Sequence, residues 1–446
     1  MKRRIFAGAC SLGLISAALV AASPAVAEPR PSSEGAAPGL PTVAISQPAP
    51  EGTTIAADLP GMKALDIDST LAISEIVQDD VDGSINTVTW DSDRDVIQFY
   101  VYGDSSELTR TIAAELPGDQ MWEVIPSARP IDELEATIER LASSPDALPA
   151  GMTFVSGTPA PDGASITLGI EESPTSRSRA QEAPDELLGI PVEFKAEERA
   201  QTTTRVRTAA PLVAGGYMEG PTSGDDMSCS TGYPVLRYQD SQYNMITADH
   251  CTDIQGASWK WGGGSHTVGS STFQAAGDTD LELFIEPASL STWIFVGSHT
   301  DASTVLPIRG YVSPVGGNSV CYSGSRSGLV CANTLENSDT YNCIAFLQCY
   351  WTRWSTQIDG TPAAGNGDSG GPVFVPLTRP DDNTIGAYGI GIVSMIPYPS
   401  PATCTGDPGT GTTPDEGRKC SANVGFAPLS RWASAQSTHQ LVITTQ

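Results

Sequence analysis

The chain has 446 residues, with 24 Lys and Arg against 52 Asp and Glu and a formal net charge of −28. This length exceeds one ordinary hydrophobic core, so two or more domains are expected. No basic stripe of the kind that binds a nucleic-acid backbone occurs, so the sequence predicts no nucleic-acid partner.

The first residues are typical of a secretory signal peptide. The basic run Lys2-Arg3-Arg4 precedes an apolar stretch over about residues 5–20, and small residues end it at Ala25-Val26-Ala27. We expect residues 1–27 to be removed and the product to be secreted and extracellular. No later apolar run has the roughly 18 residues that a membrane helix needs, so no membrane partner is expected.

Residues 28–57 are rich in Pro, Ala and Ser, which predicts a disordered leader. Residues 58–171 are predicted to form a small α+β domain without a catalytic constellation of its own. Its expected elements are strands at 85–90 and 96–102, a helix that starts near Asp104, a second helix that starts at Pro130, and a hairpin of residues 152–155 and 166–170.

Residues 172–209 return to Ser, Pro, Glu, Arg and Thr, which indicates a linker with sites open to proteolysis. From residue 210 to 446 the chain consists of short apolar runs separated by Gly, Ser, Asn and Pro, which favours an all-β fold. Strands are expected at 233–238, 244–247, 281–285, 293–296, 373–377 and 385–396, with one helix near 428–436.

Eight of the nine cysteines lie between Cys229 and Cys420, and an even number in an exported chain predicts a disulfide framework. Spacing alone does not fix the connectivity. The set that we consider is Cys229–Cys251, Cys321–Cys331, Cys343–Cys349 and Cys404–Cys420. No CxxC pair occurs, so no zinc site is predicted, and no other metal or cofactor is implied.

The run Gly365-Asn366-Gly367-Asp368-Ser369-Gly370-Gly371-Pro372 places one serine among glycines. Glycines accept positive φ, so they can turn successive N–H groups toward one point and form a nest for a negatively charged oxygen. This composition suits a reactive hydroxyl better than core packing, and Ser369 is the candidate nucleophile.

A serine nucleophile needs a base, and the base needs an orienting carboxylate. His250, in Thr247-Ala248-Asp249-His250-Cys251, is the candidate base. Asp280 is the candidate carboxylate because it opens an alternating strand, and Asp278 is the alternative; Asp249 is a poor choice because adjacent side chains seldom face each other. The other histidines are predicted to lie on the surface: His266, His299 and His439.

The octapeptide and the TADHC segment resemble the nucleophile and histidine motifs of chymotrypsin-like (trypsin-fold) serine peptidases, and His…Asp…Ser is their chain order. From about Leu212 onward the chain is most similar to exported actinobacterial peptidases of the streptogrisin and α-lytic type. Further matching segments are Val213-Ala214-Gly215-Gly216, Cys229-Ser230-Thr231-Gly232-Tyr233, Val320-Cys321-Tyr322-Ser323-Gly324-Ser325 and Gly391-Ile392-Val393-Ser394.

The resemblance implies a double six-stranded antiparallel β-barrel, over about 210–303 and 304–446, with the site in the cleft between the barrels. Ser369 would attack, His250 would shuttle the proton, Asp280 would orient His250, and the Gly367 and Ser369 amides would form the oxyanion hole. The same relatives have an N-terminal pro-region that assists folding and then inhibits. The α+β domain would be that pro-region, and Cys229 would staple the histidine loop through Cys251.

The resemblance also suggests a substrate pocket. Two alanines would form its floor, which argues against cleavage after Lys or Arg and favours small aliphatic residues. The residues expected to line it are Ala363, Ala364, Ser394, Met395, Ile396 and Val424. The usual cysteine upstream of the nucleophile loop is missing, since Gly365 stands there, and Cys404 is therefore expected to pair with Cys420.

The sequence thus predicts the precursor of a monomeric, secreted serine endopeptidase that acts on polypeptide substrates. Two alternatives stay open: a catalytically silent relative that serves as a binding or adhesion protein, and an esterase on the same scaffold.

Overall fold

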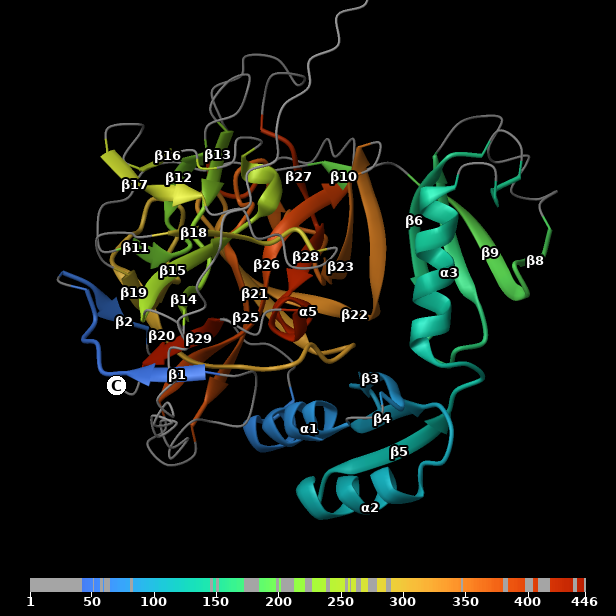
Figure 1. Ribbon diagram of the computed structural model, residues 1–446. Coiled ribbons are helices and arrows are strands. Elements are labelled where there is room, and N and C mark those ends of the chain that lie inside the picture. The colour runs from blue at the N-terminus through green and yellow to red at the C-terminus, as the bar shows by residue number, and fades with distance from the viewer. Residues whose placement is uncertain are drawn as a thin grey trace, which may run out of the picture. The chain divides into compact units, whose positions relative to one another are not determined.

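The computed structural model describes residues 42–444 apart from gaps, and Figure 1 shows its elements. The gaps are residues 51, 57–58, 60–64, 81–82, 145–146, 150–151, 172–183, 198–199, 202–211, 221–226, 238–240, 253–255, 257, 262–265, 272–278, 286–289, 346–347, 380–383, 398–403, 408–417 and 436–438. The predicted signal peptide lies outside the described residues. Among the helices that are described, none is both long and apolar enough to cross a membrane.

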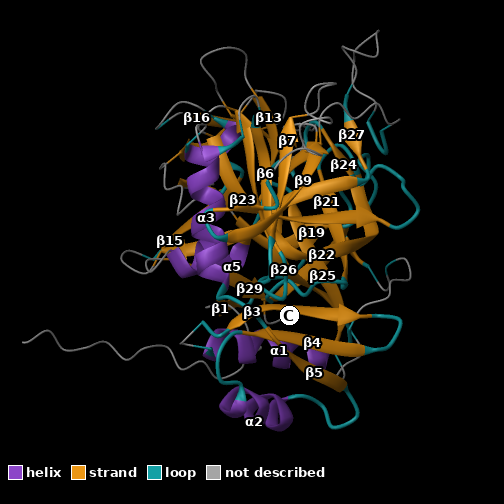
Figure 2. Cartoon of the chain, turned by 90° about the vertical axis from the view of Figure 1, so that its right-hand side faces the viewer, coloured by secondary structure: helices purple, strands orange, loops and turns teal. Residues whose placement is uncertain are grey.

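The first module of the N-terminal region is a three-stranded sheet with two helices. Strand β4 (Val96–Val101) pairs antiparallel with β3 (Ile85–Asp91) and parallel with β5 (Met121–Pro126). Helices α1 (Ile67–Asp79) and α2 (Ser106–Glu115) lie close to this sheet (Figure 2) and share its apolar core. Strands β3 and β4 and helix α2 were predicted, whereas β5 was not. Helix α1 was missed, although the Asp66 side chain accepts a hydrogen bond from the Ser69 amide as an N-cap.

The second module consists of helix α3 (Ile131–Ser143) on strands β6 (Phe154–Pro159), β7 (Ile166–Glu171), β9 (Ile190–Glu197) and β8 (Glu186–Leu187). The predicted stripe of α3 is buried, with Leu134, Ile138 and Leu141 all 0% exposed. Strand β9 pairs parallel with β7. The linker predicted at 172–209 is therefore wrong for β8, β9 and the short strand β10 (Ala200–Gln201).

The missed signal in β9 is a two-residue period. Ile190, Val192 and Phe194 are less exposed than Pro191, Glu193 and Lys195, which alternate with them. The Ser-, Glu- and Arg-rich composition of the surrounding segment concealed this alternation, and the open edge of β7 supplies the partner that makes it a strand.

The leader predicted to be disordered at 28–57 also contains strands. Strand β1 (Thr42–Ile45) pairs parallel with β29 (His439–Thr444), as Figure 1 shows, and β2 (Thr54–Ile55) pairs parallel with β20 (Thr304–Tyr311). Between them, Gln47 accepts a hydrogen bond from the Thr292 amide and donates one to the Leu290 carbonyl. The disorder prediction is wrong for these residues because composition does not reveal a partner strand hundreds of residues away.

The C-terminal region is all-β, as predicted. Its first sheet joins β1 and β29 to seven strands of the segment before residue 286: β12 (Tyr217–Gly220), β13 (Met227–Ser230), β14 (Pro234–Arg237), β15 (Gln242–Thr247), β16 (Ser258–Trp261), β17 (His266–Ser271) and β18 (Glu282–Ile285). All pairings among these seven strands are antiparallel. Because β29 pairs with β14, the end of the chain belongs to the first sheet rather than to the second.

The second sheet contains a closed six-stranded antiparallel barrel. Its strands, in order around the barrel, are β21 (Ser319–Gly324), β22 (Gly328–Ala345), β23 (Gln348–Gln357), β28 (Asn423–Pro428), β26 (Ile385–Pro397) and β25 (Pro372–Thr378). The strands β11 (Leu212–Ala214) and β19 (Leu290–Phe295) reach this sheet through β20. The predicted boundary near residue 303 therefore does not separate the two sheets: β11 and β19 precede it but belong to the second sheet, and β29 follows it but belongs to the first.

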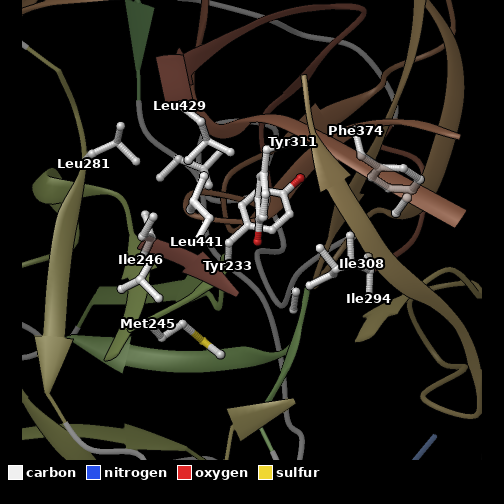
Figure 3. Close-up of a cluster of buried hydrophobic side chains, with 14 of the residues drawn as sticks. Tyr233, Met245, Ile246, Leu281, Ile294, Ile308, Tyr311, Phe374, Leu429 and Leu441 are labelled. Carbon is white, nitrogen blue, oxygen red and sulfur yellow. The ribbon is translucent and has the colours of Figure 1, made fainter. Parts of the chain in front are cut away.

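One apolar cluster joins the two sheets. Tyr233, which directly precedes β14, and Tyr311 from β20 meet edge to face, with ring centroids 5.2 Å apart, and Figure 3 shows Leu441 and Leu429 beside them. Leu429 begins α5 (Leu429–Ala435), the helix that was expected near 428–436. The four disulfides pair the cysteines as the sequence analysis expected: Cys229–Cys251, Cys321–Cys331, Cys343–Cys349 and Cys404–Cys420.

Candidate active site

Ser369 lies in the glycine-rich turn between β24 (Ala364–Gly365) and β25. The turn is held by its carbonyl groups. The Ser369 carbonyl accepts a hydrogen bond from the Ser230 amide at 2.6 Å, and the Gly367 carbonyl accepts one from Ser230 Oγ at 3.0 Å. Gly367 has a φ of +117°, a conformation that residues with a side chain rarely adopt. The backbone of this turn therefore requires glycine, as its composition indicated.

The same turn orients two amides. The Asn366 carbonyl accepts from Arg418 Nε at 3.0 Å, and the Asp368 carbonyl accepts from the Gly371 amide at 2.8 Å. In a trans peptide, the N–H points opposite to the carbonyl of the preceding residue. The Gly367 and Ser369 N–H groups are thus directed away from Arg418 and from Gly371, respectively.

His250 lies in the short 3₁₀ turn Asp249–Cys251, directly after β15. The Cys229–Cys251 disulfide fixes this turn to β13. His250 Nε2 is 2.9 Å from Ser369 Oγ, and its side chain is only 5% exposed. The structure therefore brings the predicted base to the predicted nucleophile across 119 residues of sequence.

Asp280 stands just before β18 and is fully buried. Its Oδ2 is 2.6 Å from His250 Nδ1, and its Oδ1 accepts a hydrogen bond from the His250 amide at 3.0 Å. Ser394 Oγ donates a further bond to Oδ2 at 2.5 Å. Burial alone raises the pKa of Asp280, but the attraction to His250 and the bonds from His250 and Ser394 outweigh it, so the pKa lies below its ordinary value. The alternative, Asp278, lies outside the described residues.

The other histidines lie elsewhere. His299 is partly exposed. His439 is only 6% exposed, bonds Asn244 at 3.2 Å and lies against Trp432, so its prediction as a surface residue is wrong. The tail strand β29 carries it into the first sheet, which its position near the end of the sequence does not reveal. The side chain of His266 is outside the described part of the chain.

Asp249 is a second carboxylate beside this constellation. Its Oδ2 accepts a hydrogen bond from the Tyr350 hydroxyl at 3.2 Å, which links the histidine turn to β23 of the second barrel. Burial, followed by repulsion from Asp280, raises the pKa of Asp249 to about 6. The sequence marked this aspartate as a departure from the family motif but gave no sign of Tyr350, which is 101 residues away.

The six predicted pocket residues are all buried, but they do not form one wall. Ala363, Ala364, Ile396 and Val424 belong to one apolar cluster, whereas Met395 packs with Tyr350 and Trp354. Ser394 is bonded to Asp280. Four of the six side chains therefore lie together, and Met395 and Ser394 serve other contacts.

The described residues contain one candidate set of metal ligands, and its chemistry does not suit a metal ion. The one group of three candidate ligands there consists of Cys229, His250 and Cys251. Both of these sulfurs are committed to the Cys229–Cys251 disulfide, so they cannot act as thiolate ligands.

No family model and no curated protein matches this chain. Similar solved structures include Thermobifida fusca protease A, with 20% identity and a TM-score of 0.35 over 52% of this chain and 98% of that chain. Nocardiopsis protease has 18% identity and a TM-score of 0.34 over 52% and 98%. A glutamic acid specific serine protease has 21% identity and a TM-score of 0.35 over 50% and 97%. These values are too low to transfer a function from any of these proteins.

Proposed function

We propose that this chain is the precursor of a secreted serine endopeptidase. The observation that carries the proposal is the continuous hydrogen-bonded series Ser369 Oγ–His250–Asp280, with heavy-atom distances of 2.9 and 2.6 Å. A hydroxyl, an imidazole and a buried carboxylate in this order are the groups that nucleophilic acyl transfer requires.

In the proposed reaction, Ser369 Oγ attacks the scissile carbonyl while His250 Nε2 takes its proton. Asp280 stabilises the resulting imidazolium and keeps Nδ1 protonated. The Gly367 and Ser369 amides donate to the oxygen that becomes negative. His250 then protonates the leaving amine, and a water molecule, deprotonated by His250, hydrolyses the acyl-enzyme.

The N-terminal region is proposed to be a pro-region that assists folding and then inhibits. Strand β10 pairs antiparallel with β26 at Ile396 and Pro397, two and three residues after Ser394, and it therefore lies against the strand that carries the Asp280 partner. Strand β6 extends the second barrel by pairing with β22. In addition, Glu139 accepts a hydrogen bond from Trp351 Nε1 at 2.9 Å. These contacts support occlusion of the site until the segment between the two regions is cut.

Preference for small aliphatic residues at the cleaved position is supported by Ala363, Ala364, Ile396 and Val424, which belong to one apolar cluster; none of these four side chains carries a charge that could pair with Lys or Arg. Hydrolysis rates for matched peptide anilides ending in Ala, Val, Phe and Arg check this preference. Faster cleavage after Phe or Arg would contradict it. The N-terminal sequence and the four disulfides support secretion, and we expect a monomer that acts on polypeptides.

The test is to label the processed protein with an active-serine phosphonylating probe and to map the modified residue. Modification of Ser369, together with hydrolysis of a protein substrate, supports the endopeptidase. Ser369→Ala and His250→Ala should abolish labelling and leave the precursor uncut if processing is autocatalytic. No labelling of the wild-type protein would favour the silent binding protein, and labelling with hydrolysis of esters but not of peptides would favour the esterase.

A further inference from the structure

A buried arginine lies beneath the nucleophile turn. The Arg418 side chain is 1% exposed, and the Asp368 side chain with which it pairs is 0% exposed. Arg418 Nη2 donates to Asp368 Oδ2 at 2.6 Å and to Ser327 Oγ at 2.7 Å. Asp368 directly precedes Ser369, so this ion pair is attached to the nucleophile by one peptide bond.

The same guanidinium reaches the backbone that carries the predicted oxyanion hole. Arg418 Nε donates to the Asn366 carbonyl at 3.0 Å. That carbonyl and the Gly367 N–H belong to one planar peptide and point in opposite directions. Because glycine tolerates most backbone conformations, this peptide can rotate at little cost unless something holds its carbonyl. The Arg418 bond supplies that restraint.

Arg418 is itself held by described residues close to the Cys404–Cys420 disulfide. Its Nη1 donates to the Thr405 carbonyl at 2.8 Å and to the Asp407 carbonyl at 3.0 Å. Next to it, the Lys419 amide donates to Asn366 Oδ1 at 3.1 Å, and the Lys419 carbonyl accepts from the Asn366 amide at 2.7 Å. These residues therefore hold both the arginine and the residue whose carbonyl the arginine binds.

In the described part of this turn, no disulfide joins the turn to the segment that carries Arg418. Gly365 has no side chain, and any side chain at this position would clash with Cys420 Sγ, so Cys420 packs directly against the turn while its disulfide leads to Cys404. The attachment of the nucleophile turn to this segment thus includes the Arg418 bonds, the two Lys419–Asn366 bonds and the short pairing of β24 with β27 (Cys420–Ser421).

We propose that Arg418 is a positioning residue for the oxyanion hole: it holds the Gly367 amide toward the reacting carbonyl through the Asn366 carbonyl and the Asp368 carboxylate. The inference rests on the proposed peptidase function. A purely structural ion pair would instead stabilise the fold without affecting the chemical step.

The experiment compares Arg418→Met and Arg418→Lys with the wild type, each expressed as the full precursor and processed. Active sites are counted with the phosphonylating probe, and kcat and KM are measured for a peptide substrate. Arg418→Met should lower kcat about 100-fold with little change in KM, because the loss of one oxyanion donor costs on the order of 10²–10³ in kcat. The kcat of Arg418→Lys should lie between those of the wild type and Arg418→Met, because lysine keeps the charge but lacks the planar guanidinium fork.

Arg353→Met is the matched control. Arg353 is a buried arginine that likewise pairs with one carboxylate, Asp339 at 2.6 Å, and with two backbone carbonyls, those of Glu336 and Asn337. The Arg353→Met variant should be less stable than the wild type, but its kcat per active site, counted with the probe, should equal that of the wild type. A peptide aldehyde, which forms a tetrahedral adduct, should bind Arg418→Lys more weakly in proportion to the loss in kcat, whereas a product peptide should bind it normally.

The positioning role would be overturned if Arg418→Lys had the kcat and the aldehyde affinity of the wild type. Equal losses of kcat in the Arg418 and Arg353 variants would overturn it as well. Either result would leave the proposed peptidase function intact. If Arg418→Met does not accumulate as folded protein, the kcat and aldehyde measurements on Arg418→Lys decide. A wild-type protein without labelled Ser369 would overturn the peptidase and this inference together.

Discussion

Replacing Asp249 by Asn should make the protein more stable near neutral pH and leave it little changed in acid. Asp249 lies between the histidine turn and Tyr350, and burial, followed by repulsion from Asp280, raises its pKa to about 6 from an ordinary 3.8. The folded protein therefore binds this proton more tightly than the unfolded chain does. Asparagine keeps an oxygen that can accept the Tyr350 hydroxyl bond but cannot ionise.

The magnitude follows from the shift in the pKa. Below about pH 4 the carboxyl is protonated in both states, so it costs no stability. Between pH 4 and 6 the unfolded chain ionises first and the free energy of unfolding falls; above pH 6 the loss is complete. A shift of about two pKa units corresponds to roughly 3 kcal/mol. The advantage of Asp249→Asn should therefore grow by roughly 3 kcal/mol between pH 4 and pH 7.

The assay is urea unfolding at several pH values between 4 and 8, with Ser369→Ala in both proteins to prevent self-digestion. Tyr350→Phe is the companion variant, because the Tyr350 bond lowers the pKa of Asp249 and its removal should move the transition to higher pH. A constant difference between parent and Asp249→Asn from pH 4 to 7 would refute the reasoning. An advantage that shrinks as the pH rises would do the same.

Two further outcomes test the candidate site and the proposed pro-region. Asp280→Asn should retain the fold but lower kcat about 10⁴-fold, because the amide cannot hold His250 in the correct tautomer; peptide hydrolysis measures it, and a loss below tenfold would contradict the role of Asp280. Glu135→Gln removes the charge of Glu135, which lies in the proposed pro-region and forms a partly exposed ion pair with Arg431 at 2.5 Å; it should weaken inhibition by the proposed pro-region added in trans by about fivefold. Unchanged inhibition would show that this pair contributes nothing.

Local signals predicted several of the elements whose cause is local, although the local signals of α1 and β9 were missed. The apolar stripe of α3 and the alternation of β4 each depend on a few adjacent residues, and both elements formed where expected. Strand β1 depends instead on β29, which is about 400 residues away, and its own composition resembles that of a disordered segment. The side chains of β1 therefore give little sign of a strand, because β1 is stabilised by pairing with the edge of a strand elsewhere in the chain.

The residues of the candidate site also fall into those that a local motif marks and those that depend on distant contacts. Ser369 and His250 stand in motifs where glycine conformation or a nearby cysteine constrains the backbone, so the sequence marks them directly. The choice of Asp280 over Asp278 required a strand position, which is a weaker signal. Arg418 and Tyr350 have no motif, since each acts through a contact made across the fold, with Asp368 at a separation of 50 residues and with Asp249 at 101.

This division has a physical reason. The groups proposed to touch the substrate need special backbone conformations or fixed neighbours, and such requirements are written into adjacent residues. The groups that hold them need only a donor or an acceptor at the right point in space, which many residues could supply from many positions. The turn of the proposed nucleophile is accordingly marked by its own sequence, whereas Arg418, which bonds the Asn366 carbonyl of that turn, lies in a segment without a motif.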